Sequence, residues 1–112
     1  MSGFPNFYVL VGPNTGLGHN SIIFMIEAQV RFVMHCVRRI LGEGLRTLDV
    51  RPEVQRRFMA DLQARMGRTV WQSGCQSWYL DEQGHNATLW PGYTWQYWLR
   101  TRKVRAGDFA AA

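Results

Sequence analysis

Two stretches in the first half of the chain have hydrophobic patterns that predict secondary structure. Residues Phe7–Val11 are apolar at nearly every position, which is typical of a strand covered on both faces, as in a parallel sheet. Residues 21–41 show helical spacing of apolar side chains and predict one long helix. Asn20 or Ser21 is placed to act as its N-cap, and Gly42 stands where a left-handed residue would end it. The stripe expected to be buried consists of Ile22, Ile26, Val30, Val33, Val37, Ile40 and Leu41.

The middle of the chain predicts a short extended piece and a second helix. Leu45–Val50 reads as a short extended piece. Pro52 is suited to the first position of a helix that continues to Met66. The apolar stripe of this helix consists of Val54, Phe58, Leu62 and Met66.

The last third predicts a β-hairpin and one more short helix. Residues 77–81 and 86–90 flank a Glu-Gln-Gly-His turn, which indicates two antiparallel strands. After Pro91 and Gly92, residues 93–102 predict a helix of three turns or fewer. Residues 106–112 are expected to be frayed.

The order strand, helix, helix, hairpin indicates an α+β fold that is incomplete. The run Phe7–Val11 resembles an interior strand, yet no second strand of its type follows to pair with it. A strand without neighbours would leave two rows of backbone donors and acceptors unpaired. The first two turns of the long helix, residues 22–26, are apolar on every side and need protein around them. We therefore expect the chain to be a piece of something larger.

Composition limits the classes of protein that remain. A chain of 112 residues with 46% hydrophobic and 19% charged residues forms one domain and is not disordered. No apolar run approaches the roughly 20 residues of a membrane helix, and no secretory signal precedes Val11. Two cysteines do not make a disulfide scaffold. A reducing, cytoplasmic location is the expectation.

The net charge of +5 raises the question of nucleic-acid binding. The basic residues include pairs at 38–39 and 56–57 and four in a tail over 100–105, so the sequence does not gather them in one stripe. Nucleic-acid binding concentrates basic side chains on one face. We expect no nucleic-acid partner.

Longer motifs show a family resemblance. The segment FPNFY at 4–8 and the segment GPNTGLGHNSIIFMIEAQ at 12–29 resemble the last strand–loop–helix of a flavin-dependent monooxygenase of the Baeyer–Villiger and flavin-containing group. Four further segments are similar to the family's C-terminal part in the same order: DVRP at 49–52, TVW at 69–71, GCQSWY at 74–79 and LWPGYT at 89–94. The resemblance covers about residues 3–105.

The resemblance implies an architecture and cofactors. Residues 1–44 would be the last strand–loop–helix of an FAD-binding domain, and residues 45–112 the helix, hairpin and tail that pack on it. Family enzymes use FAD and NADPH to place an oxygen atom in a ketone or on a heteroatom. Their dinucleotide fingerprints are absent from this sequence, so the resemblance implies a chain that is inactive without the missing N-terminal portion.

The loop before the long helix carries the candidate cofactor site. A helix N-terminus presents unpaired N–H groups and a partial positive charge, which bind anions and polarised oxygens. The resemblance directs this end toward the pyrimidine edge of the flavin, whereas composition alone also fits an ordinary glycine-rich connection. The residues expected at the cofactor are Gly12, Asn14, Gly16, Gly18, His19, Asn20, Ser21 and Ile22. As an independent dinucleotide fingerprint the loop fails, since Ser21 replaces the third glycine.

The other histidines, the cysteines and the remaining polar side chains are expected to have structural roles and not catalytic ones. His35 and His85 are expected to be structural, and Cys36 among apolar neighbours to be a buried small side chain. The cysteines and histidines lack zinc-ligand spacing. No base lies near Cys75 or Ser77 to activate a nucleophile. Glu27 is expected on the inward side of the long helix, facing a basic group of the missing portion.

A dense aromatic block supports an alternative function. The block consists of Trp71, Trp78, Tyr79, Trp90, Tyr93, Trp95, Tyr97 and Trp98. Packing of this block onto a neighbouring domain fits the fragment hypothesis. The alternative is a small non-enzymatic interaction module, which associates through the block with itself or with a flavoprotein partner.

Overall fold

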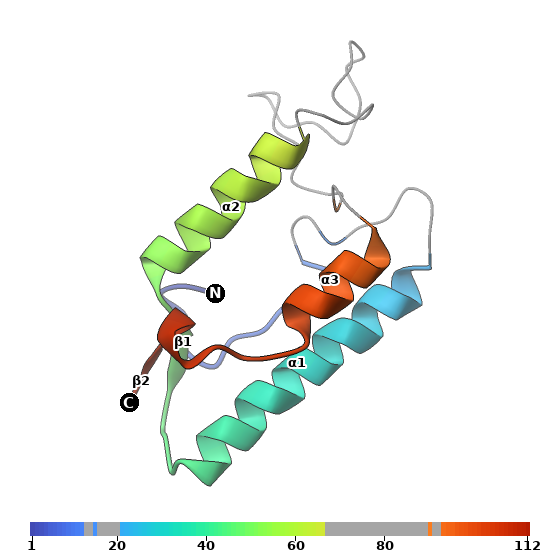
Figure 1. The fold of residues 1–112 in the computed structure, drawn as a ribbon. Coiled ribbons are helices and arrows are strands. Elements are labelled where there is room, and N and C mark those ends of the chain that lie inside the picture. Colours follow the sequence, from blue (N-terminus) through green and yellow to red (C-terminus); the bar gives the residue numbers. More distant parts are fainter. Residues whose placement is uncertain (13–14, 16–20, 67–89, 91–92) are drawn as a thin grey trace.

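The computed structural model describes residues 1–12, 15, 21–66, 90 and 93–112 (Figure 1). It combines helices with one two-stranded antiparallel sheet, which agrees with the α+β class. The expected hairpin over 77–81 and 86–90 lies outside the described residues except for Trp90. No helix among the described residues is long and apolar enough to cross a membrane.

The helix α1 (Ile22–Gly42) confirms the long helix but buries a different face. Its buried residues are Met25, Ala28, Gln29 and Cys36, whereas Val30 of the expected stripe is 43% exposed. Because the first turns are apolar on all sides, periodicity could not select the inward face. Packing selects it: α3 (Thr94–Thr101) lies along the N-terminal half of α1 (Figure 1).

The C-terminal end of α1 corrects the expectation for Gly42. Gly42 is still helical, and Gly44 has the left-handed backbone, with φ 64°. The N–H of Leu45 donates to the carbonyl of Ile40 at 2.9 Å, as in a Schellman cap. The chain turns two residues later than predicted because the glycine at position 44 accepts a positive φ without steric cost.

The C-terminal tail is ordered, so the prediction of a frayed tail is wrong. The strand β1 (Leu48–Val50) lies inside the extended piece expected over 45–50. It pairs antiparallel with β2 (Phe109–Ala111), which follows a 3₁₀ turn at Ala106–Asp108. Leu48 faces Ala111 and Val50 faces Phe109. The tail is held because its backbone finds a strand partner more than 50 positions away in sequence.

Asn6 covers the other edge of β1. Its backbone N–H donates to the carbonyl of Leu48 at 3.1 Å, and its side-chain Oδ1 accepts from the N–H of Leu48 at 2.9 Å. Its Nδ2 donates to the carbonyl of Arg46 at 2.9 Å. Asn6 has a positive φ of 58°, which asparagine tolerates better than most residues. One residue thereby takes the place of a third strand.

The helices α2 (Pro52–Met66) and α3 confirm the two remaining helix predictions. Pro52 opens α2, and Leu62 and Met66 of the expected stripe are buried. The described core cluster consists of Met25, Ala28, Leu62, Trp90 and Tyr97. It therefore joins α1, α2 and α3 around two aromatic rings.

The expected strand at Phe7–Val11 does not form. The segment has no strand pairing in the structure, and Leu10 and Val11 lie in a turn. Val11 has a φ of 55°, an unusual value for a β-branched residue. A strand is stable only where another strand pairs with it. The described part of this chain offers no such partner to Phe7–Val11, as the lack of a second strand of this type in the sequence indicated.

Candidate functional site

The structure describes only the ends of the candidate cofactor loop. Gly12 precedes it, Thr15 lies within it, and Ser21 and Ile22 follow it. The other predicted cofactor residues lie outside the described residues: Asn14, Gly16, Gly18, His19 and Asn20. The site is therefore built from the end of α1 and from the segment that leads into the loop.

The N-terminal end of α1 is uncapped by side chains among the described residues. Ser21 occupies the N-cap position with extended backbone, as predicted, but its hydroxyl makes no capping hydrogen bond. The first turn contains no acidic residue, and Ser21, Ile22 and Ile23 are exposed. No described side chain therefore caps the N–H groups of this turn, where the helix dipole places about half a positive charge. The N-terminal end of α1 is therefore suited to bind an electron-rich hydrogen-bond acceptor.

Gly12 is not required by close packing in this arrangement. A Cβ at Gly12 would meet the Val9 side chain at 3.5 Å, which is ordinary contact. Its carbonyl accepts a hydrogen bond from the Thr15 hydroxyl at 2.6 Å. This bond closes the start of the loop.

Gln29 holds the segment before the loop against α1, and sequence reasoning did not single it out. It is 6% exposed and the one buried polar residue described in α1. Its Oε1 accepts the N–H of Val11 at 2.8 Å, while its Nε2 has no hydrogen bond of good geometry within the described residues. The signal available in the sequence was its position four residues after Met25 and next to Ala28, which places a polar side chain on the same helix face as these two small or apolar residues.

Tyr97 and Tyr8 show how apolar the surroundings of this segment are. Burial raises the pKa of Tyr97, and the nearby Gln29 amide offsets this only in part. Burial and the adjacent Cys36 raise the pKa of Tyr8 to about 12. Both hydroxyls stay protonated at neutral pH, so neither serves as a base.

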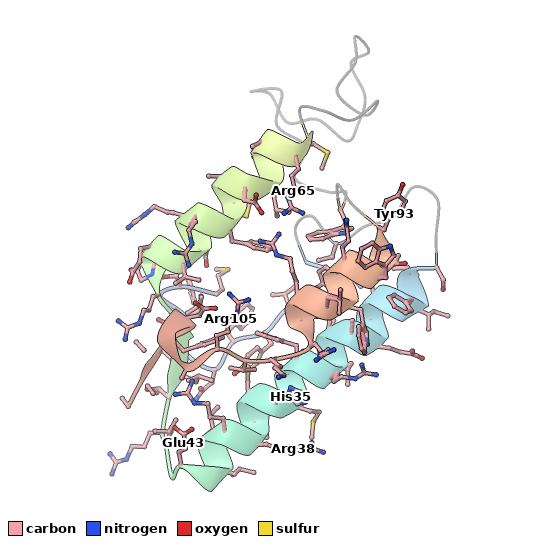
Figure 2. All side chains as sticks on the ribbon, in the orientation of Figure 1. His35, Arg38, Glu43, Arg65, Tyr93 and Arg105 are labelled. Carbon is pink, nitrogen blue, oxygen red and sulfur yellow. The ribbon has the colours of Figure 1, made fainter. Side chains whose placement is uncertain are left out.

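Cys36 is a buried, neutral thiol, as predicted. It is fully covered on α1, and burial raises its pKa despite the opposing effects of Tyr8 and Arg39. A thiol with a raised pKa is a poor nucleophile. Among the described residues, no three potential metal ligands gather; Cys75, Ser77 and His85 lie outside them. His35 is half-buried on α1 (Figure 2).

Glu27 corrects another expectation. It is exposed and not on the inward side of α1. Met25 and Ala28 face the core, and Glu27 lies between them in sequence, about 100° of helix rotation from Ala28. Within this chain Glu27 thus faces away from the core, and its pairing with a basic group of the missing portion stays a prediction.

The aromatic block divides into a buried and an exposed pair where it is described. Trp90 and Tyr97 meet edge to face at 5.0 Å inside the core. Tyr93 and Trp95 stack at 6.3 Å and are 64% and 56% exposed; Tyr93 marks the beginning of α3 (Figure 2). Trp98 carries a guanidinium on its ring from Arg31 and another from Arg102, and Trp71, Trp78 and Tyr79 lie outside the described residues.

Comparisons with known proteins place the chain in an enzyme family. No family model matches the sequence, and no solved structure is a significant match. A Baeyer–Villiger monooxygenase of Pseudomonas aeruginosa is 44% identical over 110 residues, 96% of this chain and 21% of the relative. A Baeyer–Villiger monooxygenase of Streptomyces coelicolor is 46% identical with the same coverages. An FAD-binding monooxygenase of Aspergillus niger is 37% identical over 94% of this chain and 18% of the relative.

The share of the relatives' length that this chain matches is as informative as the sequence identity. The chain spans about a fifth of the length of these relatives. The likeness extends over almost the whole chain, from the segment before α1 to the last helix, in agreement with the resemblance seen in the motifs. The chain belongs to the flavin-dependent monooxygenases of the Baeyer–Villiger type and corresponds to their C-terminal segment.

Proposed function

We propose that the chain supplies the C-terminal part of an FAD- and NADPH-dependent Baeyer–Villiger monooxygenase. The observation that carries this proposal is the 44–46% identity over 96% of the chain. In the complete enzyme, FAD reduced by NADPH would activate dioxygen, and one oxygen atom would enter a ketone or a heteroatom substrate. Residues 1–44 would complete the FAD domain, and residues 45–112 would pack on it.

The proposed contribution of this chain is electrostatic. The first-turn N–H groups of α1, near Ser21 and Ile22, would face the pyrimidine edge of FAD, where negative charge gathers when the flavin is reduced. Preorganised donors at such a position stabilise that charge, as in an oxyanion hole. The uncapped, acid-free end of α1 supports this role. Gly12, Asn14, Gly16, Gly18, His19 and Asn20 would complete the contact.

A chimeric enzyme tests the proposal. This chain replaces the matching 110 residues of the P. aeruginosa relative, and the relative truncated before those residues is the control. We expect the chimera to retain FAD and to oxidise NADPH in the presence of a ketone, while the truncated protein loses both properties. A chimera that folds without FAD would contradict the proposal.

A second function is favoured by the exposed aromatic pair. Tyr93 and Trp95 could join the chain to a second copy or to a flavoprotein partner, as a small interaction module. Sedimentation of the chain over a hundredfold concentration range distinguishes the two. Self-association that Trp95→Ser removes, without any gain of FAD in the chimera, would favour the interaction module.

A further inference from the structure

Gln29 is a buried polar residue whose two amide atoms face different parts of the molecule. Its Oε1 accepts the N–H of Val11 at 2.8 Å, directly before Gly12 and the candidate cofactor loop. A backbone N–H can only donate, so this contact fixes which atom of the amide is the oxygen. The Nε2 then points the other way, where it has no hydrogen bond of good geometry within the described residues. A buried donor without a full partner costs stability, so packing alone does not explain a glutamine at this position.

The Tyr97 hydroxyl of α3 lies beside the amide of Gln29. Burial raises the pKa of Tyr97, and the Gln29 side chain lowers it in part, which is the effect of a hydrogen-bond donor on a phenol. Because Oε1 is occupied by Val11, the donor is Nε2. Tyr97 is itself held in the core, where its ring meets Trp90 edge to face at 5.0 Å. A tyrosine packed in this way can orient the amide.

Val11 depends on Gln29 for its position at the start of the loop. Its φ of 55° is unusual for a β-branched residue, and the bond to Gln29 is the described interaction of its N–H. Gly12 adds no close packing, since a Cβ there would make only ordinary contacts. A side chain of α1 therefore holds the backbone that leads into the loop.

The two ends of the loop are consequently tied to one helix. The chain enters α1 through Ser21, and the Val11 backbone is bonded to α1 at Gln29, eight positions later. Eight residues of helix span about 12 Å. The bond to Gln29 thus sets where the Val11–Gly12 backbone lies relative to the first turn of α1.

We propose that Gln29 is a positioning residue for the flavin contact: oriented by the Tyr97 hydroxyl, it holds the Val11–Gly12 backbone in place beside the first-turn N–H groups of α1. Because Gln29 and Tyr97 are buried, they act through this backbone and not by touching the flavin. This role rests on the proposed function, since it takes those N–H groups as the ones that meet FAD. The affinity for FAD then depends on a buried amide of α1 and on a tyrosine of α3.

Amide exchange at Val11, followed by NMR in the chain by itself, tests the hydrogen bond. Gln29→Met keeps the length and approximate volume of the side chain but cannot accept the Val11 N–H. We expect the Val11 amide to exchange at least about tenfold faster in this variant. The amide of Leu45, bonded to the carbonyl of Ile40, is the internal control and should not change. Equal exchange at Val11 with Gln29 and with Met would overturn the proposal.

The FAD affinity of the chimera with the P. aeruginosa relative tests the link to the cofactor. Gln29→Met should weaken FAD binding about tenfold, as expected for the loss of one hydrogen bond that orders the site. The matched variant Gln29→Glu keeps an acceptor for Val11 and should stay within about twofold. Unchanged FAD affinity in Gln29→Met would overturn the proposal.

The unfolding midpoint separates positioning from a merely structural role. In the chimera without FAD, Gln29→Met should move the midpoint by less than about 2 °C. Methionine fills the same space, the half-paired Nε2 is removed, and the N–H of the 46% exposed Val11 can turn to water. A large drop in the midpoint with unchanged FAD affinity would assign Gln29 to stability alone and overturn the proposal.

A double-mutant cycle tests whether Tyr97 acts through Gln29. Tyr97→Phe removes the hydroxyl and keeps the ring that packs on Trp90. We expect FAD binding about threefold weaker with Gln29 present, and no further loss in the Gln29→Met chimera, because contacting residues are not additive. Equal losses on both backgrounds, or no loss with Gln29 present, would overturn the role of Tyr97.

The failures of the two proposals differ. A chimera without substitutions that folds but retains no FAD would contradict the proposed function, and the exchange at Val11 would then still decide whether Gln29 holds this backbone. A chimera that binds FAD equally well with Gln29 and with Met would retain the proposed function and overturn the positioning role.

Discussion

The two ends of α1 differ in how far this chain completes them. At the C-terminal end, Gly44 reverses the backbone, the N–H of Leu45 caps the carbonyl of Ile40, and Arg39 pairs with Glu43 at 3.0 Å. At the N-terminal end, the helix has no side-chain cap among the described residues, and Ile23 is 63% exposed. One end finds its hydrogen-bond and charge partners within the chain, and the other finds none among the described residues.

This difference indicates on which side of the chain we expect the rest of the enzyme to pack. Exposed apolar side chains at Ile23 and Phe24, and over Phe7–Val11, lie on either side of the candidate cofactor loop. Large apolar surfaces on otherwise folded proteins mark sites of contact with other protein. The incomplete end of α1 is therefore the proposed side for both the flavin and the N-terminal portion.

The largest expected effect contrasts two neighbouring positions at the incomplete end. Met25→Ala removes a fully buried side chain from the core and should lower the free energy of unfolding by about 2–5 kcal/mol. Ile23→Ala removes an exposed side chain and should change it by less than about 0.5 kcal/mol in the chain by itself. Urea unfolding measures both. If Ile23→Ala were as costly as Met25→Ala, the end would already be covered and the comparison would fail.

Removing the side-chain hydrogen bonds of Asn6 should have the next largest effect on the free energy of unfolding. Asn6→Ala removes the side-chain hydrogen bonds to Leu48 of β1 and to Arg46 just before it, and leaves the N–H of buried Leu48 unpaired. We expect a loss of about 2 kcal/mol in the free energy of unfolding. Asn6→Gly loses the same bonds but accepts the positive φ, and should recover about 1 kcal/mol. Equal losses in the two variants would show that backbone strain plays no part.

A matched pair of glycines tests the completed end of α1. Gly44→Ala places a Cβ at φ 64° and should lower the thermal midpoint, at a cost of about 1 kcal/mol. Gly42→Ala changes a helical residue with open space around it and should leave stability equal or slightly higher. The opposite order would mean that Gly42 ends the helix after all, as the sequence suggested.

The smallest effect concerns the ion pair between α2 and α3, the two helices that enclose the core at the incomplete end. Burial alone would raise the pKa of Asp61, but its hydrogen bonds and charge interactions with Arg100 and Arg65 outweigh this and lower it. The stabilisation is present above the ordinary Asp pKa of about 4. It is lost as pH falls through the lower pKa of the folded chain.

Because Asp61 is partly exposed, the contribution is at most about 0.5 kcal/mol. It should appear as a small difference in the unfolding midpoint between pH 6 and pH 2. Asp61→Asn should remove that difference, with Glu53→Gln as a control that breaks no ion pair among the described residues. An unchanged pH dependence in Asp61→Asn would assign the effect to other carboxylates.

Local signals determined much of the architecture. The helices over 22–42, 52–66 and 94–101 follow from apolar spacing, from Pro52 and from flanking breakers, because helical hydrogen bonds join residues four apart. The burial of Cys36 followed from its apolar neighbours in the same way. The family resemblance was likewise present in the order of short motifs and is supported by the relatives.

Tertiary structure alone decided which partners these elements take. The tail became β2 because β1 offered it an edge. Leu10 and Val11 lie in a turn because no described strand pairs with Phe7–Val11 and because Gln29 accepts the N–H of Val11. The inward face of α1 was set by the helix packed against it. Strand pairing and helix packing depend on residues far apart in sequence, which composition and periodicity do not encode.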